Sequence, residues 1–160
     1  MKEKIRAALR SAASLEAVKT GVIDVLRAAR EEEQAEQLGY VAGIVTSDGP
    51  AKINDNVKRL EAYTEQIRQE QGYPVFSSTD VFSQAIFDQI HAHGLPNQAW
   101  LDFWQDVFGS GHVTDVFMTP RWEQSTGAQD EYETAKRLGL TVHYVEGEPK
   151  TENGNPGKWV

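Results

Sequence analysis

One acidic residue, Glu131, stands on what the sequence predicts to be an apolar helix face. The spacing over 127–138 places four residues on one helical stripe: Ala128, Glu131, Ala135 and Leu138. An ionisable side chain on such a stripe is costly unless it is paired or functional. Because helical side chains tilt toward the N-terminus, we expect the carboxylate to point back toward the preceding loop. Glu131 is therefore a candidate nucleophile or general base, or the ion-pair partner of Lys136 or Arg137.

The residues that open this helix could bind an anion. Thr126 is expected to be the N-cap, with Gln129 three residues later completing a capping box. The backbone N–H groups of Thr126 and Gly127 would then point out of the helix N-terminus, where anions are stabilised. Ser125 comes just before and could contribute a hydroxyl group, or only help to cap the helix.

The elements around these residues alternate between strands and helices. Short apolar runs rich in β-branched residues predict strands, and apolar residues at helical spacing predict helices between them. The expected strands are 40–46, 73–77, 112–119 and 140–145, and the expected helices are 53–67, 80–92, 97–108 and 127–138. This order predicts a parallel sheet covered on both faces. Because ligands bind beyond the carboxyl ends of such strands, the loops 46–52 and 119–127 are the expected place for a site.

The N-terminal part of the chain carries no visible chemistry. Residues 2–38 are expected to be helical, interrupted near Thr20 and Gly21, with Gly39 as a C-cap. A helical hairpin that packs on the main domain, or on a second subunit, is the simplest interpretation. The expected organisation is a helical extension over 1–38, an α/β domain over 39–146 and a flexible tail over 147–160.

Composition excludes several classes of protein. The 160 residues include 24 acidic and 16 basic ones, and the net charge of −8 argues against a nucleic-acid polymer as partner. The absence of cysteine rules out disulfides and thiolate chemistry. No apolar run is long enough to cross a membrane and no secretory signal is visible, so we expect a cytoplasmic protein.

A combination of motifs resembles the nucleoside 2-deoxyribosyltransferase superfamily. The pattern Trp122-x-x-Ser125-x-Gly127-x-x-x-Glu131 follows a predicted strand, as in small branches of that superfamily. The run Tyr40-Val-Ala-Gly43 looks like its first strand, and Asp115 matches an aspartate common in its third strand. The resemblance covers about residues 40–145 and implies a three-layer α/β/α fold of the flavodoxin-like or Rossmann-like type.

The resemblance also implies an activity on a small nucleoside or nucleotide. Glu131 would attack C1′ of the sugar, the base would leave, and water or a second base would take the sugar. The superfamily's nucleotide hydrolases place a serine at the position of Ser125, where it contacts a 5′-phosphate. They also carry an arginine in the first loop, which this sequence lacks and which Lys52 or Arg121 would have to replace. The implied substrate-binding residues are Tyr40, Gly43, Asp106, Trp122, Ser125 and Gly127. Neither a metal nor an organic cofactor is implied, and a homodimer or higher homo-oligomer is expected.

Other interpretations of these residues stay open. Tyr40 and Gly43 could serve core packing, and Trp122 could be a plain apolar lid. His91 and His93 lack a third metal ligand, and the stretch Gly43–Gly49 lacks the Lys-Ser/Thr of a P-loop. The alternatives in function are a non-catalytic nucleotide-binding or sensing module, an NAD or ADP-ribose glycohydrolase, and a purely structural oligomer.

Overall fold

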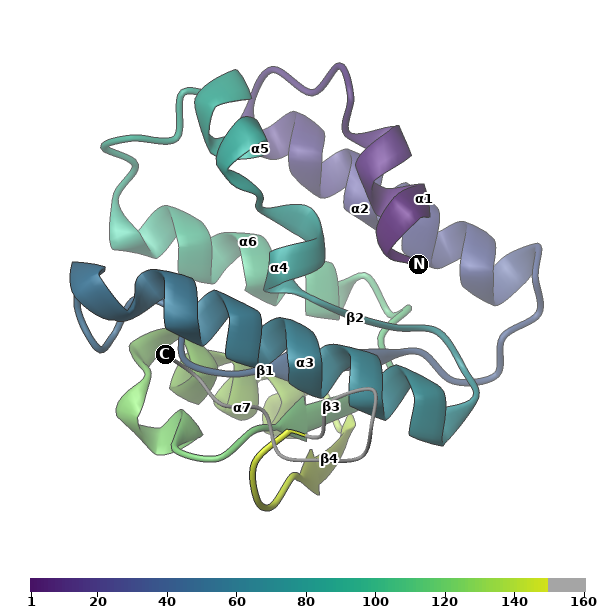
Figure 1. Cartoon of the computed structure of the whole chain (residues 1–160). Coiled ribbons are helices and arrows are strands. Elements are labelled where there is room, and N and C mark those ends of the chain that lie inside the picture. Colours follow the sequence, from purple (N-terminus) through teal and green to yellow (C-terminus); the bar gives the residue numbers. More distant parts are fainter. Residues whose placement is uncertain (150–160) are drawn as a thin grey trace.

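The computed structural model describes residues 1–149 as one α/β unit (Figure 1). Its helices are α1 (Lys2–Ala8), α2 (Leu15–Glu31), α3 (Ile53–Gln71), α4 (Ser78–Val81), α5 (Gln84–Gln89), α6 (Asn97–Gly109) and α7 (Thr126–Arg137). Its strands are β1 (Gly39–Ala42), β2 (Val75–Ser77), β3 (Asp115–Met118) and β4 (Thr141–Tyr144), and two short 3-10 turns are η1 (Pro50–Lys52) and η2 (Trp122–Gln124). Most of the expected tail, from residue 150 on, lies outside the described residues.

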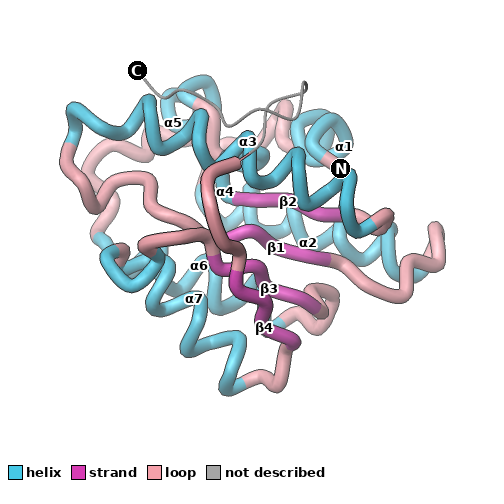
Figure 2. Tube along the Cα trace, turned by 60° about the horizontal axis from the view of Figure 1, so that its bottom comes forward, coloured by secondary structure: helices cyan, strands magenta, loops and turns pink. Residues whose placement is uncertain are grey.

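The four strands form one parallel sheet in the order β2-β1-β3-β4 (Figure 2). Helix α3 covers one face of the sheet, and α6 and α7 lie on the other (Figure 1). Helix α2 packs against α6. The expected three-layer, Rossmann-like architecture is therefore confirmed. The strands are shorter than expected, since each keeps three or four residues in the ladder and its flanks turn into loops.

Side chains alternate between the two faces of the sheet, as the period of a strand requires. Tyr40 and Ala42 of β1 pack into the larger core beneath α6 and α7, whereas Val41 packs into the smaller core beneath α3. β3 alternates in the same way, with Val116 on the larger side and Phe117 on the smaller. The two faces of the sheet therefore pack into two separate hydrophobic clusters.

The N-terminal segment is a helical hairpin, but its break lies elsewhere than expected. Residue Ser14 caps α2 by accepting a hydrogen bond from the backbone N–H of Ala17, so the turn falls between α1 and α2 rather than at Thr20 and Gly21. Gly21 lies inside α2, where a Cβ atom would meet Leu9 Cδ2 at 2.8 Å. This glycine therefore permits the close approach of α1.

Gly39 is not a C-cap: it is the first residue of β1, and α2 ends at Glu31. A Cβ atom at Gly39 would lie 2.9 Å from the Phe117 ring. The hairpin is also part of the core, because Ile5, Leu9 and Val18 are fully buried in the larger cluster.

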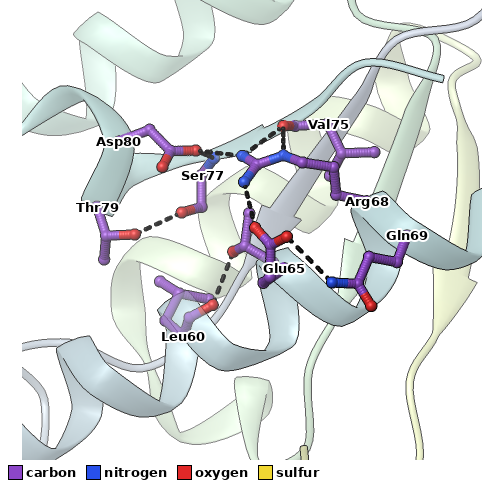
Figure 3. Close-up of polar contacts among 9 residues, drawn as sticks. Leu60, Glu65, Arg68, Gln69, Val75, Ser77, Thr79 and Asp80 are labelled. Carbon is purple, nitrogen blue, oxygen red and sulfur yellow. Dashed lines mark hydrogen bonds and ion pairs between the residues drawn. The ribbon is translucent and has the colours of Figure 1, made fainter. Parts of the chain in front are cut away.

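One arginine of α3 joins that helix to the first residue of β2 and to α4 (Figure 3). Arg68 donates to the backbone oxygen of Val75 and, at 3.1 Å, to the carboxylate of Asp80. Asp80 in turn accepts from the backbone N–H of Ser77, which completes the capping box of α4. Burial raises the pKa of Asp80, and the charge of Arg68 opposes this shift. The network sets the direction in which the chain leaves the sheet beside Tyr40.

None of the helices described over residues 1–149 combines the length and the apolar character that crossing a membrane requires.

Candidate functional site

The strand order reverses direction between β1 and β3. The chain passes from β1 to β2 on one side and returns to β3 on the other, so the loops after β1 and β3 diverge at this point. In open α/β sheets, ligands bind at such a switch point beyond the carboxyl ends of the strands. The two loops singled out from the sequence, 46–52 and 119–127, both start at this edge.

Glu131 lies on the buried side of α7, as its place on the stripe predicts. The residue is 7% exposed, and its Oε1 accepts a hydrogen bond of 2.9 Å from the Tyr40 hydroxyl. Burial raises the pKa of Glu131 to about 8, while the Tyr40 hydrogen bond acts in the opposite direction. An ion pair with Lys136 or Arg137 is not what holds this carboxylate, because both of those residues are exposed.

Tyr40 connects this carboxylate to an aromatic core. Its ring packs within 4.9–5.2 Å of the rings of Phe76, Trp104 and Phe108. Burial raises its pKa well above the usual range, and the negative charge of Glu131 adds to the effect. The hydroxyl therefore stays protonated and donates to Glu131. Tyr40 serves core packing and the candidate site at once, so the two interpretations are compatible.

The start of α7 differs from the expected capping box. Ser125, not Thr126, is the N-cap, and its Oγ accepts from the backbone N–H of Ala128 at 3.2 Å. Thr126 is exposed and is the first residue of the helix. A Cβ atom on Gly127 would find only Ser125 Oγ within 4 Å, at 3.9 Å, so space is open there.

Gly43 joins the ends of β1 and β3. A Cβ atom at this position would lie 2.5 Å from Thr119 Oγ1 and 3.1 Å from Leu60 Cδ1. The Thr119 hydroxyl donates to the backbone oxygen of Ala42 at 2.8 Å. The absence of a side chain at Gly43 thus allows the two strand ends to approach each other.

Three other residues singled out from the sequence have partners other than Glu131. Trp122 packs on Tyr132 of α7, with ring centroids 4.6 Å apart. Asp106 is exposed on α6 and forms an ion pair of 2.8 Å with Lys19. Asp115 begins β3, at the opposite end of the strand from the loop to α7, and accepts from His143 Nε2 at 2.7 Å.

A cleft at the same edge of the sheet opens on the α3 side. Its lining includes Gly43, Asn56, Arg59, Tyr63, Thr119 and Arg121. From the sequence, Arg121 is a candidate only as a replacement for a first-loop arginine, and Arg59 is not a candidate. The signal that could have found Arg59 is its place one turn after Asn56 on the helix that follows the first loop.

His91 and His93 were weighed from the sequence as possible metal ligands. Across residues 1–149, no cluster of three or more His, Cys, Asp or Glu side chains is arranged to hold a metal ion. His93 lies 3.3 Å from Asp88 on the surface.

The parallel sheet with helices on both faces defines a Rossmann-like α/β protein, with a buried carboxylate on α7 and a cleft at the strand ends as its candidate sites. The family model of DUF4406, a domain of unknown function, matches residues 37–144. The chain therefore belongs to the DUF4406 family, and the match begins just before β1 and ends with β4. No curated protein and no solved structure matches the chain significantly.

Proposed function

We propose that the protein cleaves the N-glycosidic bond of a small nucleoside or nucleotide, or transfers its sugar, with Glu131 as the nucleophile. The observation that carries the proposal is the buried carboxylate on α7, which accepts a hydrogen bond from Tyr40 of β1. A carboxylate withdrawn from water is poorly solvated, and an oxocarbenium-like transition state is stabilised by such a group beside the anomeric carbon. The DUF4406 description itself assigns no activity.

The proposed reaction has two steps. The Tyr40 hydroxyl holds Oε1 of Glu131, which leaves Oε2 to attack C1′ of the sugar. The C1′–O bond forms as the C1′–N bond breaks; the base departs with the bonding pair and takes a proton from water. Water, or a second base, then attacks C1′ and releases the carboxylate, giving free sugar or a new nucleoside.

The substrate class can be tested by product analysis. The protein is incubated with deoxyribonucleosides, ribonucleosides, their 5′-monophosphates and NAD, and free base is separated by chromatography. We expect base release by the wild type and by Glu133→Gln, an exposed position on the same helix, and none by Glu131→Gln. Acid-quenched wild type should also carry the added mass of one sugar. Base release that survives in Glu131→Gln refutes the assignment of the nucleophile, and release from NAD alone indicates the glycohydrolase alternative.

A non-catalytic binding module is the second candidate. The cleft on the α3 side does not include Glu131 in its lining, and this favours ligand binding without turnover. The discriminating result is a ligand-dependent rise in melting temperature with no free base released.

A homo-oligomer is the assembly that we propose. Strand β4 is one of the two edge strands of the sheet, and Tyr144 on it is 57% exposed. An unpaired strand edge with an exposed aromatic side chain is suited to contact with a second copy. Light scattering coupled to size-exclusion chromatography tests this, and a monomer at micromolar concentration contradicts it.

A further inference from the structure

The cleft on the α3 side brings two guanidinium groups from distant parts of the chain to one place. Arg59 comes from α3, and Arg121 comes from the loop after β3. Both line the cleft next to Gly43, at the strand ends where ligands of this fold class bind. The chain as a whole is strongly acidic, with a net charge of −8, and each of the two arginines of this cleft is paired with a carboxylate.

Each guanidinium group is held by a carboxylate. Arg59 forms a bidentate ion pair with Glu148, with Nη2 2.8 Å from Oε1 and Nη1 2.6 Å from Oε2. This two-pronged geometry is the one by which arginine also binds phosphate. Arg121 donates to Asp48 at 3.0 Å, and Asn56 donates to the same carboxylate at 3.1 Å.

The carboxylate that pairs with Arg59 is exposed to solvent. Glu148 lies in the chain after β4, which is tied to α3 by a hydrogen bond from the Tyr63 hydroxyl to the backbone oxygen of Gly147. The side chains of Glu148 and Arg59 are 47% and 24% exposed, and ion pairs of this exposure contribute little to stability. Release of Glu148 would therefore free the Arg59 guanidinium group with a small loss of folding free energy.

The backbone of Arg121 supports a role beyond a surface ion pair. This residue has a φ of 69°, in the left-handed region that non-glycine residues seldom adopt. Such strain is concentrated at ligand-binding positions. The side chain of Arg121 reaches Asp48, in the loop after β1.

We propose that Arg59 and Arg121 form a binding site for a phosphate group, and that Glu148 and Asp48 occupy the two guanidinium groups when no phosphate is bound. The cleft as it stands has room for about one water molecule. A phosphate therefore binds only when Glu148 moves off Arg59, so that the Glu148 carboxylate competes with phosphate for this arginine. This site lies on the α3 face of the sheet, whereas Glu131 lies on the α7 face, so the proposal does not depend on the glycosidic reaction.

Calorimetric titration of the full chain tests the proposal with three probes. These are inorganic phosphate, a nucleoside 5′-monophosphate and the matching nucleoside. We expect phosphate-containing probes to bind and the nucleoside to bind at least tenfold more weakly than its monophosphate. Binding of both phosphate probes identifies free phosphate as sufficient, and binding of the monophosphate alone identifies a phosphate ester. Equal binding of nucleoside and monophosphate, or no binding of either phosphate probe, overturns the proposal.

Four variants separate the site from general electrostatics. Arg59→Gln and Arg121→Gln should each weaken binding of the phosphate probe about tenfold, whereas Arg27→Gln, an equal charge change on α2, should leave it unchanged. Glu148→Gln removes the competing carboxylate and should tighten binding by about twofold to fivefold. A gain in affinity cannot come from loss of folding. A similar gain in Glu146→Gln, an exposed position two residues earlier, or no gain in Glu148→Gln, shows that Glu148 is not a competitor.

Discussion

Replacement of Glu131 by glutamine should change how the stability of the protein depends on pH. Burial raises the pKa of Glu131 from 4.5 to about 8 in the folded protein. The folded chain therefore binds this proton more tightly than the unfolded chain does. Below pH 4.5 both states are protonated and the group has no effect. Between pH 4.5 and 8 unfolding releases the proton, so the free energy of unfolding falls by about 1.4 kcal/mol for each pH unit.

The magnitude follows from these two pKa values. At pH 7 the buried carboxyl group costs the folded state about 3 kcal/mol, and above pH 8 the cost levels off near 5 kcal/mol. Glutamine has nearly the same shape and no charge, so it avoids this cost at every pH. Its side-chain oxygen can still accept the Tyr40 hydrogen bond.

Urea denaturation at pH 5, 6, 7 and 7.5 provides the measurement. The free energy of unfolding of Glu131→Gln, relative to wild type, should rise by about 3 kcal/mol between pH 5 and pH 7.5. Other titrating groups are shared by the two proteins and cancel in the difference. Glu133→Gln, at an exposed position of α7, should show no such rise. If wild type and Glu131→Gln keep parallel pH profiles, the carboxylate is not desolvated and the reasoning about the site is wrong.

Four further predictions concern the same elements. If Glu131 is the nucleophile, kcat/KM for base release should rise between pH 6 and pH 8 and level off above, because the ionised form attacks; a flat profile contradicts this. Tyr40→Phe should destabilise the fold by about 1–3 kcal/mol more at pH 8 than at pH 5, since ionised Glu131 loses its donor; chemical denaturation at both pH values decides. Arg68→Ala should lower the free energy of unfolding by about 3 kcal/mol because it leaves Asp80 buried and unpaired, and adding Asp80→Asn should recover part of this loss. If the double variant instead loses the sum of the two single losses, the pairing is contradicted. Gly43→Ala should cost about 1–3 kcal/mol in the free energy of unfolding, and Thr119→Ala in the same chain should relieve it; no relief shows that the clash lies elsewhere.

The order of helices and strands could be predicted because each element shows the spacing of apolar residues that is typical of its type. Helix α3 follows from the apolar residues at 53, 57, 60 and 67, with a threonine at 64 on the same face. The strands follow from short runs rich in β-branched residues. The break in the N-terminal hairpin could not be placed by the same rule. Gly21 is an unfavourable helix residue in isolation, but its missing side chain admits Leu9 of the neighbouring helix. That contact exists only after the two helices have packed.

The candidate site was predictable in part, for a similar reason. The burial of Glu131 follows from its stripe on α7, which is a local property of the sequence. Its partner Tyr40 lies 91 residues away, and no local pattern specifies that their side chains meet. The expected stripe also fails at its end, because Leu138 is the C-cap of α7 and is 39% exposed.

The cost of burying Glu131 is itself an argument for a function at this position. A core assembled for stability alone has no need of a carboxyl group among the aromatic rings that surround Tyr40, and an apolar or amide side chain at 131 would avoid a cost of about 3 kcal/mol at pH 7. Tyr40 supplies only one hydrogen bond, which reduces this cost without removing it. Proteins keep a poorly solvated acid where its reactivity or its proton is used. The same reasoning does not extend to Asp80, because Arg68 and the backbone of Ser77 pair that carboxylate within a network that holds β2 and α4 together. Of these two buried acids, Glu131 is the one without a structural cation, and this difference makes it the functional candidate.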